Sequence, residues 1–404
     1  MRPILGAHKK SSWLSGNVFF LGLVSLLSDA SHEMATAILP FFLTLDLKYS
    51  VAVLGLIEGL SDGASSFVKP ISGYMSDRME RRKPPINFGY ALTSLLIPAI
   101  GFATNWLQIA ALRAGAWIGR GTREAPRDAL LADSVRSEFH GRAFGFHRAM
   151  DTTGAVVGPT LALILVTTLG YREIFFLSAL PGVAALVIVL IFVKELKRER
   201  VGKRPASLGF VKTVLALPKP FVSLLVAIGV FGFANFANTL FTLRAEEVLA
   251  PRFGTASATL LAVGLYTLLN LAYAIACFPI GALGDRFGKR GILVFGYFLS
   301  AVICLCTAYL TAELAYLIVI FVGAGIFTAT TETIEGALAA DLLPSQIRGT
   351  GFGVLRTVNG AGDLASSTIV GLLWVAHSPT LAFQYSALLS AVGALALLRV
   401  KGIS

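Results

Sequence analysis

Continuous apolar segments of about 20 residues recur along the whole chain, with few polar positions inside them. Each is long enough to cross about 30 Å of hydrocarbon as a helix. Lipid offers no partners to backbone groups, so spanning segments must be helices or a closed barrel, and the continuous pattern favours helices. Twelve spans are predicted, numbered here in chain order: 16–43, 52–75, 86–104, 106–132, 142–169, 172–194, 220–243, 257–283, 291–310, 313–338, 349–375 and 379–399.

Composition supports an integral membrane protein. Of the 404 residues, 55% are hydrophobic and only 14% are charged, whereas soluble domains have about 25% charged residues. The net charge of +11 gathers before span one (Arg2, Lys9, Lys10), after span two (Arg78, Arg81, Arg82, Lys83), after span six (194–204) and after span eight (Arg286, Lys289, Arg290). All these places lie on one side of a membrane, which indicates cytoplasmic termini. We expect a multi-pass protein of the cell membrane and no nucleic-acid partner.

No motif for a cofactor, a metal or a nucleotide is present. The cysteines Cys277, Cys304 and Cys306 lie in apolar runs without metal-ligand spacing, and we interpret them as packing residues. No phosphate-binding loop and no nucleophile motif is found, so an enzyme is not expected. The first apolar run is too long, and too interrupted by acids, for a cleavable signal.

The chain repeats itself at an offset of 208 residues. The segment GYMSDR (73–78) matches GALGDR (281–286), and further matches in the same order are Gly115 with Gly323, Glu124 with Glu332, Asp133 with Asp341, Gly141 with Gly349, and Arg148 with Arg356. The repeat predicts two parallel six-helix halves, 1–194 and 220–404, joined by a linker at 195–219.

Three motifs resemble those of the major facilitator superfamily. The segment GYMSDRMERRK (73–83) is similar to its loop signature G-x-x-x-D-R-x-G-R-R-K, with Glu80 in place of the second glycine, and GALGDRFGKRG is a second copy. GAVVGP (154–159) is similar to the core of an antiporter signature, although Ala162 and Leu163 replace its trailing glycines. The resemblance implies an all-α protein with twelve transmembrane helices in two pseudo-twofold-related bundles, which work by alternating access.

The resemblance also implies gating residues. Asp77 and Arg78 would latch the halves together against the start of span eleven, and Asp285 and Arg286 would do the equivalent against span five. These contacts would hold the outward-open state.

Titratable residues lie inside the first two spans, where each costs about 2.5–3.5 kcal/mol on insertion scales. Span one places Asp29, His32 and Glu33 on one helix face, and span two carries Glu58 and Asp62 four residues apart. We expect these residues to couple transport to protons, because close acids beside an arginine exchange a proton when the arginine moves away. The alternative is that they are structural polar contacts between spans one, two and four.

Span four carries a stripe of arginines, Arg113, Arg120 and Arg127, at intervals of seven residues. A rise of about 1.5 Å per residue puts Arg113 at the depth of Asp29. We therefore predict that Asp29 or Glu33 pairs with Arg113, and that Glu58 and Asp62 share this network.

A second charged group is expected nearer the cytoplasm. Spans four and ten face each other across the pseudo-twofold axis, and we predict a gate between charges of opposite sign there: Arg120, Arg123, Glu124, Arg127 and Asp128 on span four, and Glu332 and Glu335 on span ten. Arg123 is predicted to couple with Glu332. His147, Arg148, Asp151, Arg356 and Asp363 are interpreted as residues that fix helix packing.

The second half lacks the acidic cluster and offers amides and aromatics instead. Asn235, Phe236, Asn238 and Tyr266 are the candidate substrate contacts, together with Arg113 of the first half. The function that fits best is a monomeric secondary transporter that exports a small organic compound in exchange for protons. Proton-coupled uptake of an organic anion or metal chelate is the alternative; a non-transporting receptor would leave both loop motifs without a purpose.

Overall fold

The computed structural model describes residues 12–166, 168–196 and 209–400, and in these ranges the regular structure is entirely helical. The first half contains α1 (Gly16–Phe41) with a π-helical turn η1 (Phe42–Asp46), α2 (Val51–Arg78), α3 (Lys83–Ala99) with η2 (Ile100–Phe102), α4 (Trp106–Asp133), η3 (Ser137–Phe139), α5 (His140–Leu165), α6 (Tyr171–Leu177) and α7 (Ala179–Ile191). A short helix, α8 (Phe210–Leu215), precedes the second half. That half contains α9 (Lys219–Gly232), α10 (Thr239–Phe253), α11 (Thr255–Phe287), α12 (Lys289–Ala308), α13 (Leu314–Leu342), α14 (Arg348–Ala376) and α15 (Pro379–Arg399).

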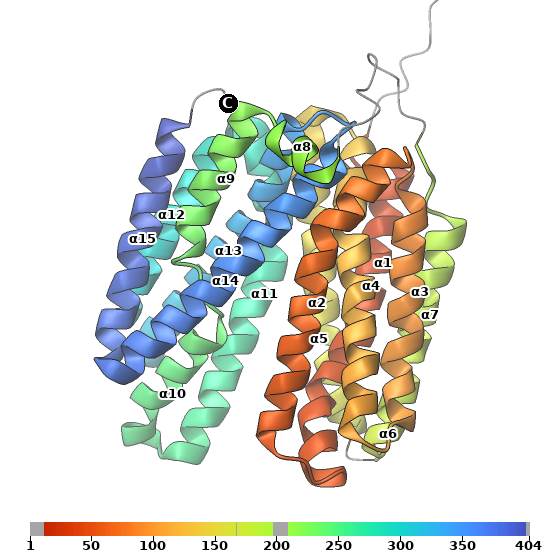
Figure 1. Cartoon of the computed structure of the whole chain (residues 1–404). Coiled ribbons are helices and arrows are strands. Elements are labelled where there is room, and N and C mark those ends of the chain that lie inside the picture. The colour runs from red at the N-terminus through yellow and green to blue at the C-terminus, as the bar shows by residue number, and fades with distance from the viewer. Residues whose placement is uncertain (1–11, 167, 197–208, 401–404) are drawn as a thin grey trace, which may run out of the picture.

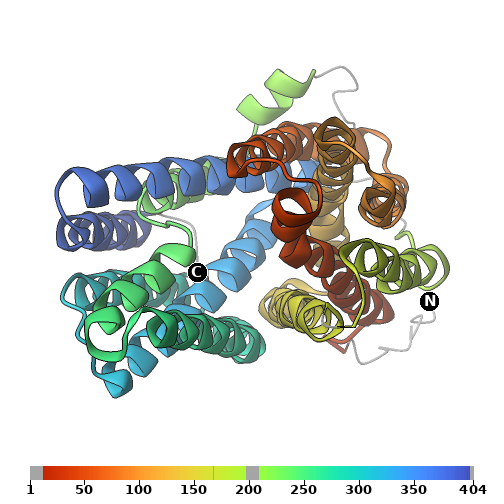
Figure 2. The ribbon, with the colours of Figure 1, turned by 90° about the horizontal axis from the view of Figure 1, so that it is seen from below.

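The helices form two bundles that lie side by side (Figures 1 and 2). The N-bundle comprises α1–α7 and the C-bundle α9–α15. We call the end where α1 begins and α15 ends the terminal face, and the other end the distal face. The predicted twelve-span, two-bundle architecture is confirmed. Arg2, Lys9, Lys10 and most of the predicted linker 195–219 lie outside the described residues, so the exact division of the chain stays a prediction.

The bundles are closed against each other at the terminal face and apart at the distal face (Figure 1). One hydrophobic core near the terminal face is built from both bundles, and its Phe144 and Phe352 rings stack at 5.7 Å across the divide. Towards the distal face each bundle has a core of its own. There Gly55, Gly59 and Gly63 of α2 have no atom of another helix within 4 Å of a built Cβ.

Seven helical segments of the described chain are long and apolar enough to span a membrane: 16–46, 83–102, 171–191, 257–287, 289–308, 314–342 and 379–399. The long helices that fall outside this set are α2, α4, α5 and α14, and these carry most of the charges within the bundles. They also make contacts across the divide, between α2 and α14, α4 and α14, and α5 and α11. The protein is therefore an integral membrane protein whose polar helices face its interior.

Two predicted spans are interrupted. Span six consists of α6 and α7, with Ser178 at the junction, and the Ser178 carbonyl accepts a hydrogen bond of 2.7 Å from Ser31 Oγ. Span seven consists of α9 and α10, separated by residues 233–238. Moreover, α10 continues to Phe253 through the segment 244–253, which the sequence pattern had suggested as a loop.

The break in span seven leaves backbone groups without helical partners, and α14 supplies some of the replacements. Ser366 Oγ donates to the carbonyl of Asn235, and the Ala237 N–H donates to Ser367 Oγ at 3.0 Å. Irregular backbone at membrane depth is tolerated only where protein satisfies it. Gly232 and Gly362 allow this close approach, since the Cα of Gly362 lies 3.2 Å from a Cβ built on Gly232.

Candidate functional site

Asp77, at the end of α2, holds the two bundles together at the terminal face. Its Oδ1 accepts from the Gly349 N–H at 3.1 Å, and its Oδ2 accepts from the Thr350 N–H at 2.6 Å. These are free amides at the start of α14, where a carboxylate is favoured by the helix dipole. A Cβ at Gly73 would overlap the carbonyl of Gly349, so glycine is what allows α2 and α14 to meet.

Asp285, at the end of α11, makes the equivalent contact with the start of α5. Its carboxylate accepts from the N–H groups of Gly141 at 2.7 Å and Arg142 at 2.9 Å. Gly281 lies against Gly141 as Gly73 lies against Gly349. Both predicted latch positions are thus at the bundle interface, related by the sequence repeat.

The arginines next to these acids are placed differently from the expectation. Arg78 and Arg286 are exposed, and the guanidinium of Arg286 lies 5.1 Å from the ring of Phe287. Arg82, which is 1% exposed, instead forms the ion pair with Asp77 and donates to the Ser345 carbonyl at 2.8 Å. The helical end of α2 turns Arg78 outward, whereas the following turn brings Arg82 back under Asp77.

A further pair of acids reinforces each latch. Asp133 of α4 forms ion pairs with Arg348 and, at 3.6 Å, with Arg82. Its repeat partner Asp341 contacts Lys289 at 2.8 Å and His140 Nδ1 at 2.6 Å. The repeat also matches His140 to Arg348. Asp133 therefore pairs with an arginine, whereas its repeat partner Asp341 pairs with a histidine at the equivalent position.

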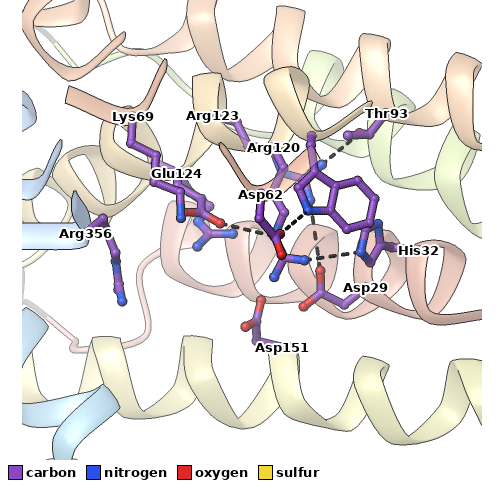
Figure 3. A network of polar contacts seen from close by, with 12 residues as sticks. Asp29, His32, Asp62, Lys69, Thr93, Arg120, Arg123, Glu124, Asp151 and Arg356 are labelled. Atoms are coloured by element: carbon purple, nitrogen blue, oxygen red, sulfur yellow. Dashed lines mark hydrogen bonds and ion pairs between the residues drawn. The ribbon is translucent and has the colours of Figure 1, made fainter. Parts of the chain in front are cut away.

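Between the latches and the distal face lies the central polar network. It comprises Asp29, His32 and Glu33 on α1; Glu58, Asp62 and Lys69 on α2; Arg113, Arg120, Arg123, Glu124, Arg127 and Asp128 on α4; Arg148 and Asp151 on α5; Glu332 and Glu335 on α13; and Arg356 and Asp363 on α14. Figure 3 shows part of it, with side chains of α1, α2 and α4 converging.

Arg113 pairs with Glu58 rather than with Asp29 or Glu33, so the predicted pair with α1 is wrong. The guanidinium, which is 1% exposed, is 2.8 Å from Glu58 Oε1 and 2.9 Å from Oε2. It also lies 3.9 Å from the centre of the Trp117 ring. The depth estimate was also wrong: Arg113 Nη1 lies 3.5 Å from Thr36 Oγ1, two turns further along α1 than Asp29, and Asp29 lies level with Arg123 instead.

Trp117 connects the acids of α1 and α2. Its Nε1 donates to Asp62 Oδ1 at 2.8 Å, and its ring lies 4.3 Å from that of His32. His32 Nε2 is 3.2 Å from Arg120 Nη1. Because a guanidinium only donates, His32 Nε2 is the acceptor here and the ring is neutral. Sequence reasoning missed Trp117, since an aromatic residue within a membrane span is more often a packing residue than a polar contact.

The other residues of the α4 stripe are paired within the N-bundle. Arg120 donates to Glu124 at 3.2 Å, and Lys69 contacts the same carboxylate at 3.0 Å. Arg123 lies over the Tyr90 ring at 4.2 Å and donates to Thr93 at 2.8 Å; its distance to Asp29 Oδ1 is 4.0 Å.

The predicted coupling of Arg123 with Glu332 is therefore wrong, because Arg123 points into the N-bundle towards α3. Glu335 also stays within its own bundle, where it accepts from Tyr297 and Asn359, each at 2.9 Å.

Four residues form ion pairs between the bundles: Asp128 and Glu332, which the sequence had suggested for a gate there, and Arg148 and Arg356, which it had suggested only for packing. We call Asp128, Arg148, Glu332 and Arg356 the inter-bundle cluster. Arg356 of α14 is 2.9 Å from Asp128 of α4 and 3.3 Å from Glu332 of α13. Arg148 of α5 reaches the same Glu332 oxygen at 3.4 Å. The repeat that matches Arg148 with Arg356 was the signal that could have found them.

The candidate contacts of the C-bundle are only partly accessible. Asn235, in the break of span seven, donates to Asp363 Oδ1 at 2.8 Å, and Asn238 is half-buried at the start of α10. Tyr266 on α11 is 36% exposed. Phe236 is 6% exposed and packs between Phe241 and Phe383, so it does not line a site in this conformation.

Neither a metal centre nor a disulfide emerges from the described residues. They contain no group of three or more His, Cys, Asp or Glu that could hold a metal ion. Cys277 and Cys304 are buried and Cys306 is half-buried, and all three are free.

Comparisons with known proteins agree with this geometry. The family model "Major Facilitator Superfamily" matches residues 21–261 and 245–402. An uncharacterized MFS-type transporter of Methanocaldococcus jannaschii is 33% identical over 95% of both chains. A multidrug resistance protein of Serratia proteamaculans is 26% identical, covering 75% of this chain and 74% of its own. A gentisate transporter of Corynebacterium glutamicum is 27% identical, covering 87% and 80%.

Solved structures share the fold at lower identity. A human organic anion transporter superposes with a TM-score of 0.74 at 17% identity, covering 95% of this chain and 99% of its own. The fucose:proton symporter of E. coli gives a TM-score of 0.73 at 17% identity, covering 94% and 97%.

Proposed function

The chain belongs to the major facilitator superfamily, whose members are transporters and not enzymes, and from this premise we propose that it exports a small organic compound in exchange for protons. Alternating access would proceed by rocking of the N-bundle against the C-bundle around the central polar network. The terminal face would be cytoplasmic, since exposed basic residues such as Arg78, Arg136 and Arg286 gather there. The closed latches would then correspond to an outward-facing state of a monomer in the cell membrane.

The observation that carries this proposal is the pairing of charges in the central polar network. Every lysine and arginine in it has a carboxylate within 4.0 Å. By contrast, Glu33, Asp62, Glu335 and Asp363 have no lysine or arginine partner among the described residues. A carboxylate without a cationic partner can bind a proton or a cationic cargo, whereas an anionic cargo needs a guanidinium that is not already paired with a carboxylate.

A second candidate function is proton-coupled uptake of an organic acid. Arg120 favours it, because its side chain is 32% exposed despite the pair with Glu124. The relative that is a gentisate transporter points in the same direction. The multidrug resistance relative supports export instead.

Transport into proteoliposomes with an imposed pH gradient separates the two. Ethidium is a suitable probe for export, because its permanent charge prevents it from following a pH gradient through the lipid alone. Exchange for protons predicts ethidium accumulation in vesicles with an acidic lumen and none in protein-free vesicles. Protein-dependent accumulation of gentisate in vesicles with an alkaline lumen, without ethidium movement, would contradict export and support the second candidate.

A further inference from the structure

Helices α1 and α5 touch backbone to backbone along the GAVVGP segment. A Cβ built on Gly154 would lie 3.1 Å from the Ala30 N atom, and one on Gly158 would lie 3.0 Å from the Met34 N atom. Asp29 precedes Ala30 on α1, and Asp151 lies one turn before Gly154 on α5. The glycines therefore press two carboxyl-bearing turns against each other.

Asp29 and Asp151 face each other in this contact (Figure 3). Ser25, one turn before Asp29 on α1, donates its hydroxyl to Asp151 Oδ1, which holds the Asp151 carboxyl group against the turn that bears Asp29. Two carboxyl groups close together in a buried site cannot both ionise easily, so one proton shared between them is favoured. Asp29 is 7% exposed, and its nearest cation is Arg123 at 4.0 Å. Asp151 accepts from Ser25 and from Arg148 at 3.3 Å.

Arg148 stands between this pair and the other bundle. Its Nη1 is 3.3 Å from Asp151, on its own helix, and its Nη2 is 3.4 Å from Glu332 of the C-bundle. Of these two partners, only Glu332 moves away when the bundles separate at the terminal face. Asp151, at 3.3 Å, is then the carboxylate that remains in contact with Arg148.

We propose that Asp29 and Asp151 share one transported proton, and that Arg148 is the positioning residue that releases it when Glu332 withdraws. The proposal deepens the proposed function and rests on it. While the terminal face is closed, Arg148 is shared between Asp151 and Glu332 and the pair keeps its proton. On opening, the negative charge lost with Glu332 is replaced by ionisation of the pair, and the proton leaves to water at the terminal face.

Other charged and titratable groups that face the pair do not carry this signal. On α1 there is Glu33; on α4 there are Arg120, Arg123 and Arg127; on α5, His147; and on α11, Tyr273 and Cys277. Glu33, the three arginines and His147 belong to the N-bundle and move with the pair. Tyr273 and Cys277 lie across the divide, but a phenol and a thiol bring no charge at neutral pH.

Infrared spectroscopy of the purified full chain tests the shared proton, through the C=O stretching band of a protonated carboxyl group. The expectation is that Asp29→Asn and Asp151→Asn each remove the same component of this band, and that the double variant removes no more. Glu313→Gln, at an exposed acid outside the central polar network, should leave that component unchanged. Persistence of the component in either single variant would overturn the proposal.

Two variants test the role of Arg148, because they should shift the titration of this infrared component in opposite directions. Glu332→Gln frees Arg148 to attract the Asp151 carboxylate, so the component should titrate about one pH unit lower. Arg148→Gln should move the titration about one pH unit higher. In the double variant the shift should follow Arg148→Gln. Equal titration midpoints in the wild type and both variants would overturn the relay.

Separate controls distinguish damage to the fold from failure of the proposed function. Glu332→Asp keeps the charge and should titrate like the wild type, which distinguishes the relay from damage to α13. These measurements need neither substrate nor gradient. A wild type that fails to exchange ethidium for protons would therefore refute the proposed function, while the infrared result decides on the carboxyl pair independently.

Discussion

Arg356 of α14 and Asp128 of α4 form a 2.9 Å ion pair that crosses from one bundle to the other. Asp128 is 1% exposed, so separation of the bundles must transfer both charges to new partners or to water. Because Glu332 also contacts Arg356, at 3.3 Å, this ion pair is one part of the inter-bundle cluster. The charges that close the terminal face are thus continuous with the acids proposed to carry protons.

Asp128→Asn should favour opening of the terminal face. Removal of one partner from a buried ion pair costs about 3–5 kcal/mol, and here the closed conformation bears that cost. Spin labels at the exposed distal positions Asp46 and Arg252 report the change as a shorter distance in double electron–electron resonance. Arg244→Gln is the matched control, since Arg244 pairs at 2.8 Å with Glu247 on its own helix. An unchanged distance distribution in Asp128→Asn would show that the ion pair does not hold the terminal face closed.

Gly73→Val should open the terminal face by a different route, because its side chain would meet the backbone of Gly349. Overpacking of this kind costs about 1–3 kcal/mol, enough to change the ratio of conformations about tenfold. Gly59→Val lies on the same helix, where a built Cβ meets nothing within 4 Å. The same pair of spin labels should therefore respond to the first substitution and not to the second. Equal changes in the distance for both variants would show that steric contact at Gly73 is not what opens the terminal face.

Arg113→Gln should impair coupling more than binding, because it leaves Glu58 without its cation. Ethidium transport driven by a pH gradient should fall at least about tenfold, equivalent to about 1.4 kcal/mol. Equilibrium binding of ethidium should change less than about twofold. Arg172→Gln serves as the control, since Arg172 pairs with Asp46 at 3.8 Å away from the network. Loss of binding with proton movement intact would instead favour an anionic cargo.

Ser366→Ala should destabilise the break between α9 and α10. The buried carbonyl of Asn235 would lose its donor, at a cost of about 1–3 kcal/mol. Thr357→Ala on the same helix removes a hydroxyl that donates at 2.9 Å to the Gly353 carbonyl within its own helix, so its effect should be small. Thermal unfolding in detergent compares the two variants; a larger loss for Thr357→Ala would contradict this account of the break.

The latches could be predicted from sequence, whereas the side-chain partners inside the bundles could not. Asp77 and Asp285 stand in duplicated motifs at helix ends, so their position is fixed by chain topology. The partner of Arg113 depends on the rotation of α4 about its axis and on its shift along α1, where Thr36 rather than Asp29 lies level with Arg113. Apolar periodicity determines neither when several faces are polar. The break at 233–238 was missed because hydropathy is continuous across it, and hydropathy does not report which backbone groups α14 satisfies.

The sequence suggested only a packing role for Asp151, because on its own helix it forms an ordinary pair with Arg148, three residues earlier. Its second neighbour, Asp29, lies far away in sequence and meets it only because Gly154 and Gly158 bring α1 and α5 together. A glycine motif that sequence similarity associates with antiport thus acquires a physical role as the contact that joins two carboxyl groups.

The distance between labels at Asp46 and Arg252, measured in lipid nanodiscs across a range of pH, tests most directly whether protonation and opening are linked. In the proposed relay, a proton bound to the central polar network favours the conformation that is closed at the terminal face. Acidic conditions should therefore enrich the longer distal distance, and alkaline conditions the shorter one, with the dependence lost in Asp151→Asn. A distance distribution that stays the same at every pH would contradict the account.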